Sequence, residues 1–77
     1  MFMQHQIDIH GFSRMEVKKY LDYCIDQLPT HIKEVIVIHG YQGGTSLQSY
    51  IRKQYHHKRV QKVLVTINPG ESILVLK

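Results

Sequence analysis

Hydrophobic and polar residues along the first half of the chain predict a strand and then a helix. Residues 6–10 alternate between apolar and polar with period two and stop at Gly11, which is typical of a strand. Ser13 and Glu16 have the spacing of a capping box, so a helix is expected to begin there and to end before Pro29. The apolar residues at helical spacing in this stretch are Val17, Tyr20, Leu21, Cys24, Ile25 and Leu28.

The second half predicts a strand, a helix and two further strands. Residues 35–38 form a continuous β-branched run bounded by Gly40, which suits a strand buried on both faces. Three residues at helical spacing then predict a helix: Leu47, Tyr50 and Ile51. Residues 60–67 alternate as a strand, residues 68–70 predict a turn, and the apolar residues 73–76 predict a last strand. The expected order is β-α-β-α-β-β.

Length and composition narrow the class of protein. The chain has 77 residues, of which 43% are hydrophobic and 21% charged, so we expect a single folded domain over residues 1–77. Cys24 is the only cysteine, which excludes an intrachain disulfide and favours a cytoplasmic location. The apolar runs are far shorter than the about 20 residues that a membrane helix requires, so no membrane partner is expected.

The charge of the chain is unevenly distributed. Residues 1–45 hold four basic and five acidic side chains, a net charge of −1, whereas residues 46–77 hold six basic and one acidic, a net charge of +5. A basic half favours a polyanionic partner, with a solvated basic face as the ordinary alternative.

An internal repeat suggests where chemistry could lie. The pattern Ile-x-Ile-His-Gly occurs at residues 7–11 and again at 36–40, an offset of 29 residues. A β-α-β unit spans roughly 30 residues, so the two strands are expected to be parallel and joined by a crossover helix. If the two glycines end the strands in register, Asp8, His10 and His39 lie together on one sheet face. The face under the helices would then carry the four isoleucines of the repeat: Ile7, Ile9, Ile36 and Ile38.

Two imidazoles and a carboxylate predict acid–base or metal chemistry. Phosphodiester cleavage requires a base and an acid, and histidine suits both roles because its pKa lies near neutrality. Asp8 would support His10 and His39 as catalytic residues, or the same three residues would hold a divalent metal, Mg or Mn, that activates water. The structural alternative is that both histidines cap the strand ends by hydrogen bonding to the glycine turns.

The glycine loop after the second repeat predicts a phosphate-binding site. Glycines allow a close backbone approach, and a helix N-terminus presents free N–H groups to an anion. A tight turn is the alternative. The expected phosphate contacts are Gly40, Tyr41, Gly43, Gly44 and Thr45.

The basic run at residues 52–59 predicts a second contact with a polyanion. It can follow a phosphate backbone, with Tyr50 or Tyr55 stacking on an unpaired base. The alternative is a solvated helix end whose cations complement the helix dipole. The cations expected to bind phosphates are Arg52, Lys53, Lys58 and Arg59.

These motifs together resemble the small MutS-related (Smr) domain family, in a stand-alone short form. The family's strand motif Leu-Asp-Leu-His-Gly is matched by residues 7–11, and its His-Gly strand end with a glycine-rich loop by residues 39–44. Its closing motif Gly-x-Ser/Thr-x-Val-x-Leu resembles residues 70–76. The family carries a basic residue and a glycine where this chain has Tyr41 and Gln42.

The resemblance implies an α+β two-layer fold like the C-terminal domain of bacterial translation initiation factor three. Such a fold has a four-stranded mixed sheet with two helices on one face, and its last strand runs antiparallel between the second and third. The resemblance also implies DNA or RNA binding and, in several members, nicking or endonuclease activity in DNA repair, recombination or RNA processing. By position, the family's functional residues are Asp8, His10, His39, Gly40 and Gly44.

Three hypotheses follow for the function. The first is a structure-selective endonuclease of DNA or RNA, and the second is a non-catalytic nucleic-acid-binding or ribosome-associated module. The third is a protein-interaction or dimerising domain, because two helices cannot cover both faces of a four-stranded sheet. The expected oligomeric state is a monomer or a weak homodimer. In that case the outer face would carry Val35 and Val37.

Overall fold

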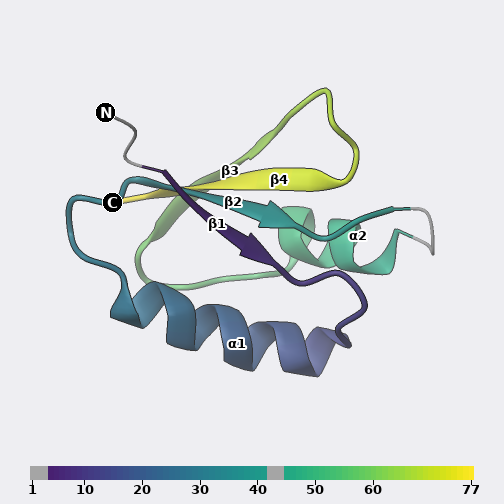
Figure 1. Ribbon diagram of the computed structural model, residues 1–77, viewed down its shortest axis with the longest axis horizontal. Coiled ribbons are helices and arrows are strands. Elements are labelled where there is room, and N and C mark those ends of the chain that lie inside the picture. The colour runs from purple at the N-terminus through teal and green to yellow at the C-terminus, as the bar shows by residue number, and fades with distance from the viewer. Residues whose placement is uncertain (1–3, 42–44) are drawn as a thin grey trace.

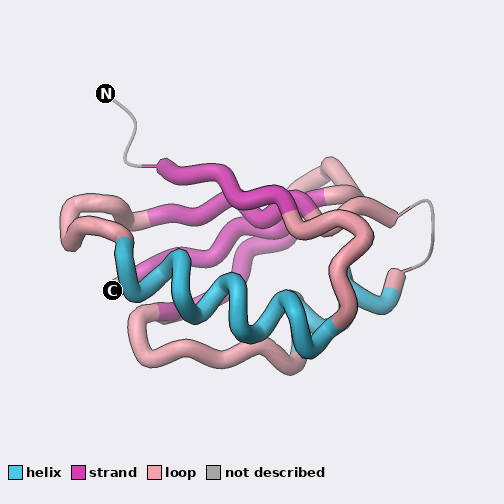
Figure 2. Tube along the Cα trace, turned by 60° about the horizontal axis from the view of Figure 1, so that its bottom comes forward, coloured by secondary structure: helices cyan, strands magenta, loops and turns pink. Residues whose placement is uncertain are grey.

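The chain folds into one four-stranded sheet with two helices on the same face (Figure 1). The computed structural model describes residues 4–41 and 45–77. The elements are β1 (Gln4–Asp8), α1 (Arg14–Gln27), β2 (Glu34–Ile38), α2 (Ser46–Lys53), β3 (Val60–Val65) and β4 (Glu71–Leu76). Figure 2 shows the two layers, with the strands above both helices. The predicted element order and two-layer architecture are confirmed.

The sheet is mixed, with strand order β1-β2-β4-β3. β1 and β2 pair in parallel, as expected for strands joined by a crossover helix, and β4 pairs antiparallel with both β2 and β3. The central position of the last strand, which the family resemblance implied, is therefore confirmed.

Helix α1 begins at the predicted capping box. The Glu16 amide donates to Ser13 Oγ at 3.2 Å, and the Ser13 amide donates to Glu16 Oε1 at 2.8 Å. The helix buries Val17, Leu21 and Ile25 completely, one residue from each turn. This apolar stripe places α1 across the sheet.

The core lies between the sheet and the helices. The strands contribute five buried residues to it, and one more directly follows β1: Ile7, Val35, Val37, Leu74 and Leu76, with Ile9. Ile51 of α2 and Tyr55, just after α2, close the core on the β3–β4 side. Alternate residues of β2 and β4 point into this core, so the other residues of these strands form the outer face of the sheet.

The register of β1 on β2 differs from the prediction by one residue. Ile7 pairs with Val37 and Asp8 with Ile38, an offset of 30 residues instead of 29. Val35 and Val37 are therefore fully buried under the helices, whereas the third hypothesis placed them on the outer face. Because β2 is apolar at four consecutive positions, its hydrophobic pattern matches either register and does not select one.

β3 is shorter and more exposed than the alternation predicts. The strand ends at Val65, which is 63% exposed, and Ile67 is fully exposed in the turn that follows. Only Val60 and Val63 pack against the core from this strand. In the part of the chain that the structure describes, neither helix is long and apolar enough to cross a bilayer.

Candidate functional site

The end of β1 carries an exposed carboxylate–imidazole pair. Asp8 Oδ1 lies 2.6 Å from His10 Nδ1 and also accepts a hydrogen bond from the His10 amide at 3.0 Å. These two hydrogen bonds hold the pKa of the Asp8 carboxyl below its usual value. With Nδ1–H donated to the carboxylate, His10 Nε2 is the nitrogen that can accept a proton. The side chains of His10 and Asp8 are 73% and 51% exposed, so a substrate can reach them.

The end of β2 carries a histidine of a different kind. His39 is 4% exposed, its Nδ1 lies 2.9 Å from the Gly40 carbonyl oxygen, and its Nε2 lies 2.9 Å from Ser72 Oγ. Arg52 Nε donates to the same Ser72 Oγ at 2.8 Å. The Ser72 hydroxyl therefore donates its proton to His39 Nε2, and His39 Nδ1–H donates to Gly40. Both ring nitrogens of His39 are thus occupied by internal partners.

The predicted cluster of Asp8, His10 and His39 on one face is wrong. The one-residue shift in register places Asp8 and His10 on the outer face and turns His39 to the helix side. Metal binding by all three residues is excluded for the same reason. Across residues 4–41 and 45–77, no group of three or more His, Cys, Asp or Glu side chains is placed to hold a metal ion.

The two glycines that follow the histidines have a structural role. Gly11 and Gly40 have φ angles of 82° and 74°, a region that side chains disfavour. The amides of His39 and Gly40 both donate to the Gly70 carbonyl at 3.0 Å, which ties the end of β2 to the β3–β4 turn. Gly43 and Gly44, two of the predicted phosphate contacts, lie outside the described residues. Thr45, the N-cap residue of α2, makes no side-chain capping bond.

A cavity of about 480 Å³ opens on the outer face where β1 and β2 end and β4 begins. Its lining residues are His10, Gly11, Ile38, Gly40, Tyr41, Asn68, Gly70 and Glu71. His10 of the exposed pair is thus part of the cavity wall. Local sequence patterns predicted His10, Gly40 and Tyr41 as site residues, but not Asn68 and Glu71, because these lie about 30 residues further along the chain.

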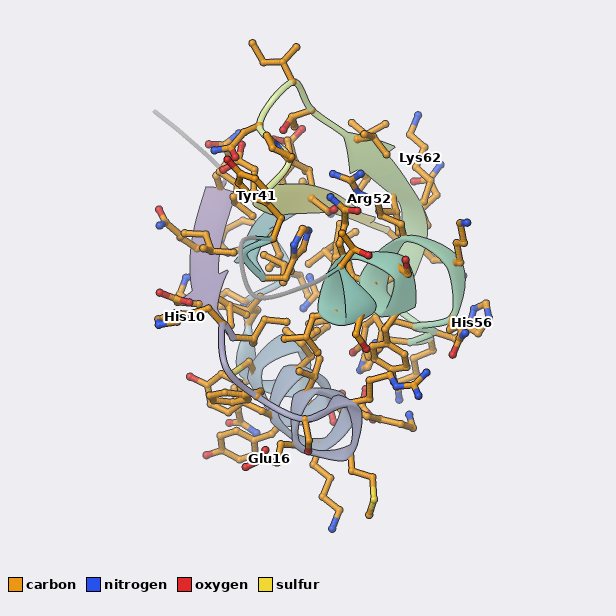
Figure 3. All side chains as sticks on the ribbon, turned by 90° about the vertical axis from the view of Figure 1, so that its right-hand side faces the viewer. His10, Glu16, Tyr41, Arg52, His56 and Lys62 are labelled. Carbon is orange, nitrogen blue, oxygen red and sulfur yellow. The ribbon has the colours of Figure 1, made fainter. Side chains whose placement is uncertain are left out.

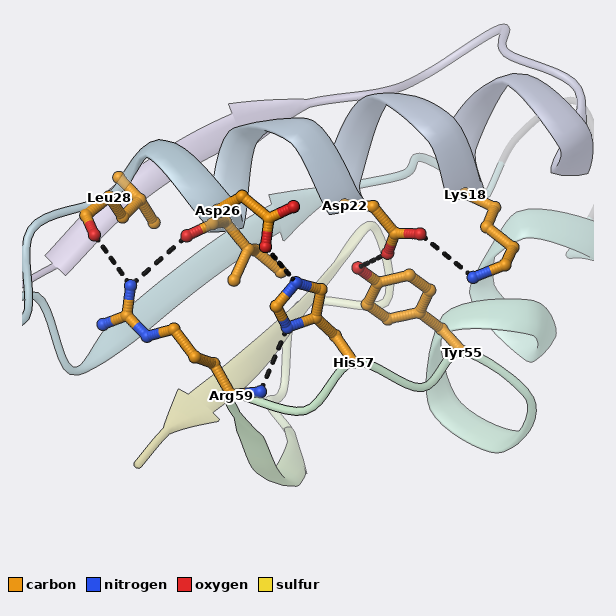
Figure 4. Close-up of polar contacts among 8 residues, drawn as sticks. Lys18, Asp22, Asp26, Leu28, Tyr55, His57 and Arg59 are labelled. Atoms are coloured by element: carbon orange, nitrogen blue, oxygen red, sulfur yellow. Dashed lines mark hydrogen bonds and ion pairs between the residues drawn. The ribbon is translucent and has the colours of Figure 1, made fainter.

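Two of the four predicted phosphate-binding cations have internal partners. The Arg59 guanidinium donates to the carbonyl oxygens of Ile25, Leu28, Pro29 and Ile32 at 2.8–3.3 Å. It thus caps the C-terminal end of α1, and Figure 4 shows its bond to Leu28. Arg52 bonds to Ser72 and to the Glu71 carbonyl. Lys53 and Lys58 are exposed. The basic run therefore divides into two cations that hold the fold and two that face solvent.

The tyrosines predicted to stack on bases also pack internally. Tyr55 is 4% exposed and donates its hydroxyl proton to Asp22 at 2.7 Å (Figure 4). Burial and this hydrogen bond raise the pKa of Tyr55. Tyr50 is half-buried, with its ring centroid 6.1 Å from that of Tyr55. Tyr41 at the cavity, by contrast, is 46% exposed and can meet a ligand.

A basic groove of about 190 Å³ lies between the end of α2 and β3. Its cationic and imidazole side chains are Arg52, Lys53, His56, His57 and Lys62. Among the described lining residues there is no Asp or Glu, although the carboxylate of Asp26 bonds to His57 Nε2 from α1 at 2.9 Å. Lys62 was not among the predicted cations, although a lysine at a polar position of the strand that follows the basic run is a signal that could have indicated it.

The groove and the cavity lie toward different ends of the sheet. Residues 60–63 of the groove pair with residues 74–76 at the end of β4, whereas the cavity lies at the end where β4 begins. Figure 3 looks along the strands from this end, with His10 and Tyr41 toward the β1 edge and Arg52, His56 and Lys62 toward the β3 edge.

Comparison with solved structures identifies the same fold in another protein. The crystal structure of the Smr domain of Thermus thermophilus MutS2 matches with a TM-score of 0.80 and 19% sequence identity, covering 95% of this chain and 98% of that chain. A scan of the sequence against models of known families gives no match, and no curated protein matches either. The chain therefore has the fold of an Smr domain, as its three motifs predicted.

Proposed function

We propose that the chain is a nucleic-acid-binding domain of the Smr type. The observation that carries this proposal is the basic groove between α2 and β3, in which Lys53, His56 and Lys62 join Arg52 without a carboxylate among the described lining residues. Cations on one groove attract a phosphate backbone, and they release counterions when the backbone binds. The Smr fold and the net charge of +5 over residues 46–77 support the same partner class.

The binding test is a salt titration of affinity for DNA and RNA, measured by fluorescence anisotropy. Each phosphate contact contributes about −0.9 to the slope of log K against log salt on duplex DNA, or about −0.7 on a single strand. We expect Lys53→Gln/Lys62→Gln to lose about two such contacts. The matched control is Lys19→Gln/Lys77→Gln, which removes the same charge from exposed positions outside the groove. Equal losses in both variants would contradict a role for the groove.

A second candidate function is phosphodiester cleavage by the Asp8–His10 pair. It is favoured by the exposed imidazole whose Nδ1 is held by a carboxylate at 2.6 Å beside a cavity. His10 Nε2 would remove the proton of the attacking hydroxyl, from water or an RNA 2′-OH, as its oxygen bonds to phosphorus and the bond to the leaving oxygen breaks. The imidazolium would then return that proton to the leaving oxygen. His39 has no free nitrogen for this exchange.

The cleavage test uses branched DNA and structured RNA, with Mg²⁺, with Mn²⁺ and with a chelator. Loss of a general base typically lowers a rate by about 10²- to 10⁴-fold, so we expect His10→Ala to reduce strand scission by that amount. His31→Ala is the control, since His31 is exposed and lines neither the cavity nor the groove. If His10→Ala does not change the rate of strand scission, the catalytic role of His10 is contradicted. The chain would then be a non-catalytic binding module, free or associated with the ribosome.

A further inference from the structure

The residues that line the cavity on the outer face suit a flat ring. Three of its described lining residues are glycines, which present only backbone: Gly11, Gly40 and Gly70. A Cβ atom placed on Gly70 would lie 3.5 Å from Cδ1 of Tyr41 and 3.7 Å from the Gly40 Cα, so the tyrosine ring lies against the glycine backbone. Ile38 adds an apolar side chain. An aromatic ring next to side-chain-free backbone suits a planar ligand that stacks.

The charge of the cavity differs from that of the basic groove. Glu71 is the one carboxylate among the described lining residues, and no lysine or arginine is among them. A phosphate entering this cavity would therefore be repelled, whereas a neutral group with N–H donors would be attracted. The group of a nucleic acid that enters here is accordingly a base, while its phosphates remain at the rim.

The polar side chains that line the cavity indicate which of the bases it would bind. A carboxylate accepts two hydrogen bonds side by side, and the Watson–Crick edge of guanine presents two adjacent donors, N1–H and the 2-amino group. Asn68 Oδ1 accepts from the Gly70 amide at 2.8 Å, which fixes its amide and leaves its NH₂ as the donor group. Guanine O6 is an acceptor next to N1–H, so one carboxylate and one amide donor complement the guanine edge.

We infer that this cavity binds an unpaired guanine base, stacked on Tyr41 and recognised by Glu71. The inference rests on the proposed nucleic-acid binding and deepens it. His10 lines the same cavity, so a base held there places its own sugar and phosphate beside the exposed Asp8–His10 pair.

The test compares two single-stranded 12-mers by anisotropy, oligoadenylate and the same strand with one central guanine. We expect the guanine to increase the affinity about 10-fold, within the roughly 5- to 150-fold that one bidentate base contact provides. Inosine at the same position, which lacks the 2-amino group, should lose most of this gain. Equal affinity for the two strands would overturn the inference, and no affinity for either would instead overturn the proposed nucleic-acid binding.

Variants of the cavity residues test whether the preference for guanine arises in the cavity. Glu71→Gln should abolish the preference for guanine while retaining the affinity for oligoadenylate, and Tyr41→Ala should lower the affinity for the guanine strand about 5- to 100-fold. The controls are Glu34→Gln, on the sheet at the opposite end of β2, and Tyr23→Ala, whose side chain is 65% exposed on α1. A guanine preference that survives Glu71→Gln, or that Glu34→Gln removes equally, would overturn the assignment.

Discussion

The ends of β1 and β2 carry the same five-residue pattern but place it in opposite environments. His10 is exposed, pairs with Asp8 and keeps Nε2 free, whereas His39 is buried and hydrogen-bonded through both ring nitrogens. β1 is an edge strand, whereas β2 is central and has neighbours on both sides. His39 at the end of β2 bonds to Ser72 of the neighbouring β4, and Arg52 of α2 donates to the same serine. A repeated motif therefore predicts repeated backbone geometry, but it does not predict a repeated chemical role.

The shared feature of the two ends is the backbone. In both, the glycine after the histidine takes a positive φ angle, which lets the chain turn away sharply from the strand. The different feature is the face to which the histidine points, and a shift of one residue in pairing reverses that face. One end can take part in chemistry and the other holds the structure.

The largest expected effect is a difference in stability between variants of the two histidines. We expect His39→Ala to lower the free energy of unfolding by about 2–4 kcal/mol, because it leaves a cavity and removes a partner from Ser72 and Gly40. His10→Ala should change it by less than about 0.5 kcal/mol, since the side chain is exposed. Urea denaturation followed by circular dichroism measures both. Similar losses in the two variants would contradict the difference between the strand ends.

A smaller loss of stability is expected when the glycine at the end of either strand is replaced, and it should be the same for both glycines. Gly11→Ala and Gly40→Ala each force a side chain into the left-handed region, at a cost of about 1–2 kcal/mol. A methyl group at Gly11 would meet nothing within 4 Å, and one at Gly40 would meet His10 Cβ at an ordinary 3.7 Å, so crowding adds little. The same denaturation experiment applies. A cost at one glycine only would show that the two turns are not equivalent.

The smallest effect concerns the protonation of the exposed pair. The pKa of Asp8 is lowered in the folded state by hydrogen bonds from the His10 ring and amide. Its stabilising contribution is thus present above the unfolded pKa of about 3.9, and it is lost as pH falls through the lowered folded value. Carboxyl ¹³C NMR titration of the wild type and His10→Ala measures this shift. We expect the pKa of Asp8 to rise in the variant, and an unchanged value would contradict the pairing.

Much of the fold could be predicted from local patterns. The capping box at Ser13, the helical stripe of Val17, Leu21 and Ile25, and the alternation in β1 depend only on neighbours along the chain. The three motifs also predicted the Smr fold, which the comparison with a solved structure confirms. These signals are strong because a helix or strand must bury one face, whatever it packs against.

The candidate site could be predicted only in part. Asp8 and His10 are two residues apart on one strand, so their contact follows from the sequence once the strand is assigned. Ser72 was missed, although a serine alternating with Leu74 and Leu76 on an inward face is itself the signal of a buried polar partner. Glu71 and Asn68 reach the cavity only because β4 lies beside β2.

The sequence by itself determined the order of elements, the two glycine turns and the uneven charge, because each is a property of residues close together in the chain. Tertiary structure decided which histidine is exposed, which arginines hold the fold and which side chains line the cavity. The physical reason is that β2 is apolar on both faces, so its hydrophobic pattern fits two registers equally well. Pairing and packing across the whole sheet selected one register, and that register determined which side chains reach the cavity and which are buried.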